Sequence, residues 1–195
     1  MKVRSKRQDA QLNRERVLDA ALDVFGEQGV DGSTETIAAR AGVGVATVFR
    51  HFPSKRELLE AALERMITQL AESLEKLLER EDAEHAFFEA LAQLVERAGT
   101  KKALAEGLSG PGEEIRSRVW SNQLRSSLTR LLERAQRCDA VRDDIGIEEL
   151  SAVLIAAART IEHTRGDAEL RARVLRVIFD GLRPPAGAQR APRRP

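Results

Sequence analysis

The chain has 195 residues, of which 42% are hydrophobic, 32% charged and 4% aromatic. This balance is typical of a folded globular protein long enough to bury a core, and no apolar run approaches the roughly 18 residues of a membrane span. The only cysteine, Cys138, excludes an intrachain disulfide framework. We therefore expect a cytoplasmic protein that does not enter the membrane.

The net charge of +1 hides an uneven distribution of charge along the chain. Residues 1–56 carry ten Lys and Arg against seven Asp and Glu, whereas residues 57–182 carry eighteen against twenty-four. The last thirteen residues carry four Arg and no acid. A basic N-terminal segment beside an acidic body is typical of a protein whose N-terminal end binds a polyanion.

Helical periodicity dominates the sequence, and few stretches alternate as strands do, so we predict an all-α fold of about nine helices. Residues 1–11 are charged and without periodicity, and residues 183–195 are rich in Pro and Arg, so both segments are predicted to be disordered. The expected helices span residues 12–28, 34–40, 45–52, 55–80, 83–97, a short segment near Leu104, 112–137, 147–163 and 168–182.

The second and third expected helices are separated by a short turn that contains Gly42 and Gly44. This spacing predicts a helix-turn-helix unit, in which the second helix supports the third and Ile37 meets Val48 across the turn. Phe49 and Phe52 are expected to anchor the third helix on the first. A helical hairpin that packs against a protein partner has the same spacing, and it remains the alternative.

Residues 14–63, RERVLDAALDVFGEQGVDGSTETIAARAGVGVATVFRHFPSKRELLEAAL, resemble the N-terminal domain of the TetR family of transcriptional regulators. The matching features are Ala20-Ala21, Phe25, Gly29, Ile37-Ala38, Ala41-Gly42-Val43, Arg50-His51-Phe52 and Lys55. The resemblance implies a helix-turn-helix DNA-binding domain with a basic arm at residues 1–54. A helical domain for ligand sensing and dimerisation would follow at residues 55–182.

The resemblance also implies which residues contact DNA. Thr34, His51 and Lys55 would bind phosphates, and Arg14 would assist them with the basic arm before it. Arg50 could reach either the backbone or a base. The residues expected to face base edges are Val45, Ala46 and Thr47, which offer few hydrogen-bond donors, so contact with thymine methyl groups is their natural chemistry.

One position departs from the family pattern. Phe49 stands where the family usually has a tyrosine, whose hydroxyl commonly contacts phosphate. We expect Phe49 to keep the packing of that tyrosine and to lose its hydrogen bond.

A single recognition helix makes too few base contacts for a specific site, so a homodimer on a palindromic operator is expected. Two apolar stripes in the last two helices suit its interface, although they could also pack only inside the monomer. The interface candidates are Leu150, Val153, Leu154, Ala157, Ala158, Ile161, Leu170, Val174, Val177 and Ile178.

Members of the family usually bind a small-molecule effector in the helical body, and its identity cannot be read from this sequence. Candidate lining residues could equally belong to the core, and the glycine-containing stretch 100–112 could form a mobile entrance. The candidates are Met66, Leu70, Phe87, Phe88, Leu91, Leu104, Trp120, Gln123 and Leu124.

An enzyme is the main alternative class, but no phosphate-binding loop, metal motif or pairing of nucleophile and base is visible. Glu81, His85 and Glu89 share one helical face, which a salt-bridged surface explains better than a metal site. Cys138 is expected to be an inert thiol. The sequence therefore predicts a repressor without cofactor or metal, whose partners are double-stranded DNA, a small-molecule effector and a second copy of the chain.

Overall fold

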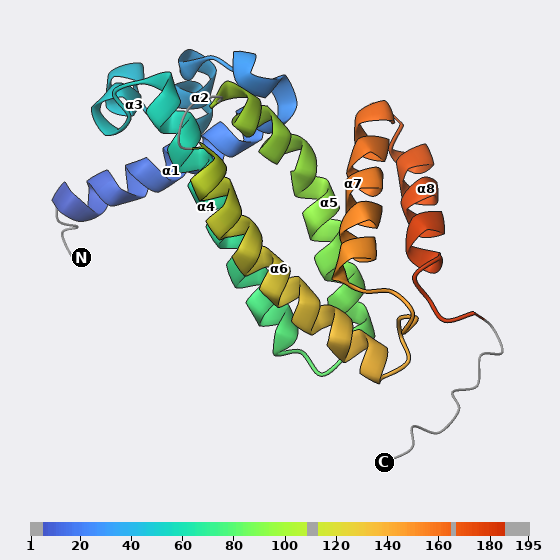
Figure 1. Cartoon of the computed structure of the whole chain (residues 1–195). Coiled ribbons are helices and arrows are strands. Elements are labelled where there is room, and N and C mark those ends of the chain that lie inside the picture. Colours follow the sequence, from blue (N-terminus) through green and yellow to red (C-terminus); the bar gives the residue numbers. More distant parts are fainter. Residues whose placement is uncertain (1–5, 109–112, 165–166, 186–195) are drawn as a thin grey trace. The chain divides into compact units, whose positions relative to one another are not determined.

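A computed structural model describes residues 6–108, 113–164 and 167–185, and the side chains of Trp120, Gln123 and Ile161 lie outside the described part. Within that part the chain is all-helical, with eight α-helices and one 3₁₀ turn at Gly29–Asp31 (Figure 1). The helices are α1 (Lys6–Gln28), α2 (Thr34–Ala41), α3 (Val45–His51), α4 (Lys55–Leu78), α5 (Ala83–Gly107), α6 (Glu113–Arg137), α7 (Ile147–His163) and α8 (Ala168–Asp180). None of the described helices is both long enough and apolar enough to cross a membrane.

Internal contacts divide the chain into two units. Unit 1 comprises Met1–Gln69 and Arg97–Trp120, and unit 2 comprises Leu70–Glu96 and Ser121–Pro195. The helices α4, α5 and α6 each contribute to both units. The expected functional division after residue 54 remains a prediction.

Local capping sets the ends of the short helices of unit 1. The Ser33 hydroxyl accepts a hydrogen bond from the backbone N–H of Thr36 at 3.1 Å and so caps the start of α2. Gly42 ends α2 in the left-handed region, at φ +66°, and the N–H of Val43 then reaches the carbonyl of Ala38 at 3.0 Å. Ser54 caps α4, as its hydroxyl accepts from the N–H of Glu57.

The core of unit 1 joins α1, α2, α3 and the start of α4. Both α2 and α3 contact α1, whose first turns extend beyond them in Figure 1. Ile37 and Val48 are both buried, as their expected contact across the turn requires. The other buried members include Val17, Leu18, Ala21, Val24, Phe25, Ala38, Ala41, Phe52 and Leu58.

Two helices are longer than the sequence pattern indicates. The first begins at Lys6 and not near residue 12, because residues 6–12 lack an apolar stripe yet are mostly good helix formers, and Gln11 donates to Glu15 at 2.8 Å. The fifth continues to Gly107, so the separate helix near Leu104 and the loose entrance expected from residue 100 are not observed over residues 100–107. Leu104 is fully buried, which holds this extension in place.

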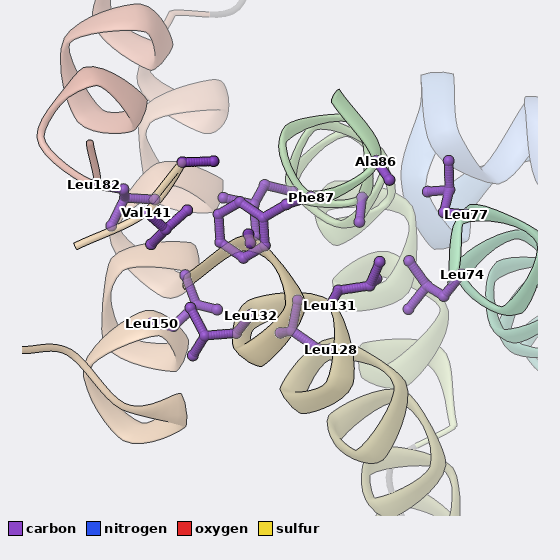
Figure 2. Packing of buried hydrophobic residues seen from close by; sticks show 14 residues of the cluster. Leu74, Leu77, Ala86, Phe87, Leu128, Leu131, Leu132, Val141, Leu150 and Leu182 are labelled. Carbon is purple, nitrogen blue, oxygen red and sulfur yellow. The ribbon is translucent and has the colours of Figure 1, made fainter. Parts of the chain in front are cut away.

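The core of unit 2 is a cluster of buried residues from α4, α5, α6 and α7 with the segments around them (Figure 2). Phe87 lies at its centre in the view, among leucines from the neighbouring helices. The cluster consists of Leu74, Leu77, Ala86, Phe87, Ala90, Leu91, Leu128, Leu131, Leu132, Ala135, Ala140, Val141, Leu150 and Leu182. The last helices, α7 and α8, lie side by side within the same unit (Figure 1).

Candidate nucleic-acid interface

The helix α3 presents one face to the core and the opposite face to solvent. Val48 and Phe52, one turn apart, are buried, whereas Ala46, Phe49 and Arg50 are exposed. Val45, Thr47 and His51 are half-buried on the flanks of this exposed face. The structure therefore leaves the expected reading residues accessible from one side.

Phe49 differs from the expectation. Its side chain is 45% exposed, so the prediction that it anchors α3 on the first helix is wrong. Phe52 is buried at that end of the helix, and residue 49 follows the buried Val48 by one position, which turns its side chain toward solvent. Phe49 is therefore part of the solvent-exposed surface of α3.

Arg14 and Lys55 lie near the C-terminal end of α3. The guanidinium of Arg14 is 5.2 Å from the centre of the Phe52 ring, a cation–π contact that fixes α1 against the end of α3. Lys55 is exposed at the first position of α4, three residues beyond Phe52. Thr34 is half-buried at the first position of α2, beside the capping Ser33.

Arg16 is a cation of this surface that the sequence pattern did not single out. A Cβ atom at Gly42 would lie 2.7 Å from its Nη2 atom, so the guanidinium covers the backbone of the turn between α2 and α3. Nothing in the sequence distinguishes Arg16 from other arginines of α1, because its position over the turn depends on how the helices pack.

Carboxylate partners divide the arginines and lysines between Arg14 and Arg65 into two groups. Arg40 pairs with Glu27 at 2.8 Å, Arg56 with Glu60 at 3.1 Å and Arg65 with Asp19 at 2.7 Å. The hydrogen bond from Arg40 lowers the pKa of Glu27, so the carboxylate stays ionised to a lower pH than a free glutamate. The second group, which we call the open cations, forms no ion pair with any described carboxylate: Arg14, Arg16, Arg50 and Lys55.

The open cations lie at both ends of α3, with Arg16 at its preceding turn and Arg14 and Lys55 near its end, and Arg50 is on its exposed face. Positive charge around an accessible short helix is the arrangement expected of a helix-turn-helix that enters a groove of DNA.

Comparison with known proteins agrees with this geometry. Residues 17–62 match the family described as bacterial regulatory proteins, tetR family, and residues 82–184 match the C-terminal domain of SbtR-like transcriptional regulators. The crystal structure of a TetR transcription regulatory protein from Mycobacterium vanbaalenii is 34% identical, covers 92% of this chain and 100% of its own, and superposes with a TM-score of 0.72. The chain belongs to the TetR family of transcriptional regulators.

Curated relatives match mainly the helix-turn-helix segment. The HTH-type transcriptional regulator SAR0097 of Staphylococcus aureus is 40% identical over 78 residues, which are 38% of this chain and 40% of that protein. The class D tetracycline repressor of Escherichia coli is 45% identical over 53 residues, 27% of this chain and 24% of the repressor. The chain thus spans less than half the length of these curated relatives.

The expected effector-lining residues of this TetR-family chain fall into both units. Phe87 and Leu91 are fully buried members of the core of unit 2, and Leu124 packs against that core. Phe88 contacts Phe179 and Arg183: the two ring centres are 6.2 Å apart, and the Arg183 guanidinium carbon lies 4.4 Å from the centre of the Phe88 ring. Met66, Leu70 and Leu104 are also buried, and the side chains of Trp120 and Gln123 lie outside the described residues. An effector pocket remains a prediction.

The expected interface residues include both buried and exposed side chains. Leu150 and Ala157 are fully buried within the chain itself, so in this structure they are core residues. Val177 is 72% exposed and Leu170 is exposed as well, and Ile155, which the sequence pattern did not single out, is 60% exposed. Half-buried candidates are Val153, Leu154, Ala158, Val174 and Ile178, and the side chain of Ile161 is not described.

The residues considered for other chemistry have ordinary surroundings. Glu89 accepts from Arg80 at 2.9 Å and lies 3.3 Å from Nε2 of His85, as expected for a salt-bridged surface. Within the part of the chain that the structure describes, no three His, Cys, Asp or Glu side chains could hold a metal ion together. Cys138 is exposed, and its Sγ lies 3.3 Å from the carbonyl of Ala135.

Proposed function

We propose that the chain is a homodimeric repressor that binds a palindromic operator through α3 and is released by a small-molecule effector. The observation that carries DNA binding is the set of open cations at the two ends and on the exposed face of α3: Arg14, Arg16, Arg50 and Lys55. In this proposal Arg14, Arg16, Lys55, His51 and Thr34 contact phosphates, while Val45, Ala46 and Thr47 face the bases.

Arg50 has two roles open to it within this proposal. It is exposed on the same side of α3 as Ala46, one turn away, and its guanidinium is long enough for either a phosphate or a guanine edge. A contact to guanine would make it the main hydrogen-bonding reader of the half-site.

A dimer follows from the size of the reading surface and from the last two helices. One α3 of seven residues contacts only a few base pairs, so two symmetric copies are needed for a specific site. Ile155 of α7 and Val177 of α8 are large apolar side chains exposed to solvent, and they support an interface that buries the outer surface of these helices.

Release by an effector and repression rest on the family alone. The SbtR-like match at residues 82–184 supports a regulatory role for the C-terminal part of the chain, and the tetracycline repressor is a relative whose name describes repression. Bound at a promoter, a dimer of this size would block access without any contact to polymerase.

Selection of bound sequences from random duplex DNA tests the proposal on the full chain. We expect an enriched inverted repeat whose half-sites lie about one helical turn, or a multiple of it, apart. The matched control is a variant in which Arg50 and Lys55 are both alanine. It should enrich nothing, although its circular dichroism melt should stay close to that of the wild type, because both side chains are exposed.

The alternative function, a helical module that binds a protein, predicts a different outcome of the same experiment. Such a module would enrich no sequence, and its association with DNA would be equally weak for all duplexes. That result would overturn the proposed regulator.

A further inference from the structure

We propose that the outward face of α3 recognises the 5-methyl groups of pyrimidines in the major groove, with Phe49 as its largest contact. This inference rests on the proposed function, because it names the chemistry by which that same surface selects its operator. It concerns the outward face of α3, defined as Val45, Ala46, Thr47, Phe49 and Arg50.

The geometry of α3 sets the order of these side chains. At 3.6 residues per turn, Ala46 and Arg50 lie along the middle of the outward face, directly opposite the buried Val48 and Phe52. Phe49 borders them on one side and Thr47 on the other. The ring of Phe49, 45% exposed, is therefore beside the middle of the face and not at a remote edge.

Hydrogen-bonding groups are scarce on this face. Arg50 is its only strong donor and the Thr47 hydroxyl its only other polar group, because no Asn, Gln, Asp, Glu or Lys belongs to it. Two such groups can distinguish bases at one or two positions of a half-site by hydrogen bonds. The remaining surface consists of methyl, isopropyl and phenyl groups.

Charge complementarity indicates what meets this apolar surface. Arg16 lies over the turn before α3, and Arg14 and Lys55 lie near its other end, so the apolar side chains are placed between cations. When those cations contact phosphates, the side chains between them face the floor of the groove. The apolar group that the major groove offers there is the 5-methyl group of thymine, which 5-methylcytosine also carries.

Phe49 is a side chain of the outward face of α3 that suits contact with bases and not with phosphates. A phenyl ring cannot donate a hydrogen bond to phosphate, and leaving it against a charged backbone gives no favourable contact. Against a methyl group and the adjacent base it loses exposed apolar area, which stabilises the complex. The exposure of Phe49 thus suits a methyl-bearing half-site.

The test compares operators that differ only in methyl groups. Deoxyuridine has the hydrogen-bonding pattern of thymidine without the 5-methyl group, so replacing single thymines of the selected half-site isolates that contact. We expect each contacted methyl to contribute about fourfold in Kd, measured by fluorescence anisotropy with the full chain. The same replacement outside the protected region is the control and should leave Kd unchanged.

A protein variant assigns the contact to Phe49. In Phe49→Ala the ratio of Kd for uracil to Kd for thymine should approach one at the position beneath residue 49, and Phe49→Leu should restore part of it. A site in which all thymines can be replaced by uracil with less than a twofold change in Kd would overturn the inference. Full thymine preference in Phe49→Ala would overturn the assignment to Phe49.

The two proposals fail in different ways. If no duplex is enriched in the selection, the proposed regulator is wrong. If an operator is enriched and bound tightly but its methyl groups contribute nothing, the regulator stands and the methyl recognition is wrong.

Discussion

At the scale of residues, the positions of a few carboxylates decide which cations remain available for DNA. Arg40, Arg56 and Arg65 each have an acidic partner, whereas Arg16 over the turn at Gly42 has none among the described residues. An arginine already paired with a carboxylate gains less from a phosphate, because it must first give up its partner. Arg16 should therefore contribute to DNA binding in a way that Arg40 does not.

Replacing Arg16 by alanine should weaken operator binding and reduce its dependence on salt. Each phosphate that the protein no longer neutralises lowers the slope of log Kd against log salt concentration by about 0.9. Because a dimer carries the substitution twice, its slope should fall by about 1.8. Arg137→Ala, which removes an equal charge from the exposed end of α6, should leave the slope unchanged. A slope for Arg16→Ala equal to that of the wild type would exclude the proposed contact.

The sequence pattern could predict which residues build the helix-turn-helix but not how each side chain is used. Helical spacing correctly assigned Ile37 and Val48 to the interior. It assigned Phe49 there as well, since an aromatic residue beside a buried position looks like core. Arg40 and Glu27 are 13 positions apart in the sequence, and Arg65 and Asp19 are 46 positions apart. Such ion pairs depend on tertiary packing, so no local sequence pattern predicts them.

At the scale of elements, polar contacts tie α6 to the end of α4 within unit 2. The buried Ser127 donates to Glu75 at 2.6 Å, and Arg130 lies 3.1 Å from the same carboxylate. Arg134 donates to the carbonyl of Leu78, the last residue of α4, at 2.6 Å, and it also contacts the carbonyls of Arg80 and Glu81 just beyond the helix. These contacts hold the C-terminal end of α4 at a fixed position along α6.

Glu75 makes this attachment sensitive to acid. The hydrogen bond from Ser127 lowers the pKa of Glu75 from its usual value of 4.5, and Arg130 adds to the effect against a smaller opposing effect of burial. A carboxyl group whose pKa is lower in the folded state stabilises that state above the unfolded pKa. The stabilisation is lost as the pH falls through the folded pKa.

We therefore expect Glu75→Gln to lower stability at pH 7 by about 1 kcal/mol, allowing for solvent screening, which is about 2–4 °C in Tm. The difference in stability from the wild type should begin to narrow below about pH 4.5 and should close as the pH falls through the lower pKa of the folded state. Glu72→Gln, an exposed neighbour on α4, should show no gap at either pH. Thermal melts between pH 3 and 7 measure both, and a gap that does not change with pH would contradict the role of the ionised carboxylate.

The lengths of the helices were predictable where one face is buried and unpredictable where it is not. The bounds of α7 match the expected 147–163, because its apolar stripe ends with the helix. The first turns of α1 and the last turns of α5 were missed, since residues 6–12 have no core-facing stripe and residues 98–103 lack a long apolar series. Helix propensity and a single buried anchor, Leu104, extend those helices.

At the scale of the whole molecule, the proposed function requires two reading helices acting together, and the exposed side chains of α7 and α8 are the surface proposed to join them. Val177 is 72% exposed and Ile155 60%, so a second copy that covered these large apolar groups would gain stability from their burial. Leu150 and Ala157 contribute to the core instead, so substitutions there would test folding and not association.

Val177→Glu should convert the dimer into a monomer, because a carboxylate buried at an isologous interface meets its symmetric copy. Light scattering after gel filtration should give about 21.6 kDa for the variant and twice that mass for the wild type. Ala92→Glu, which adds the same charge to an exposed position of α5, is the control and should remain dimeric. A dimeric Val177→Glu protein would place the interface elsewhere.

The proposed binding of DNA at the outward face of α3, between the open cations, is tested most directly by the salt dependence of operator binding. We expect three or four cations of each protomer to contact phosphates. A plot of the logarithm of the association constant against the logarithm of the KCl concentration should then have a slope between about −5 and −7 for the dimer. A slope near zero on the selected operator would contradict binding through this surface.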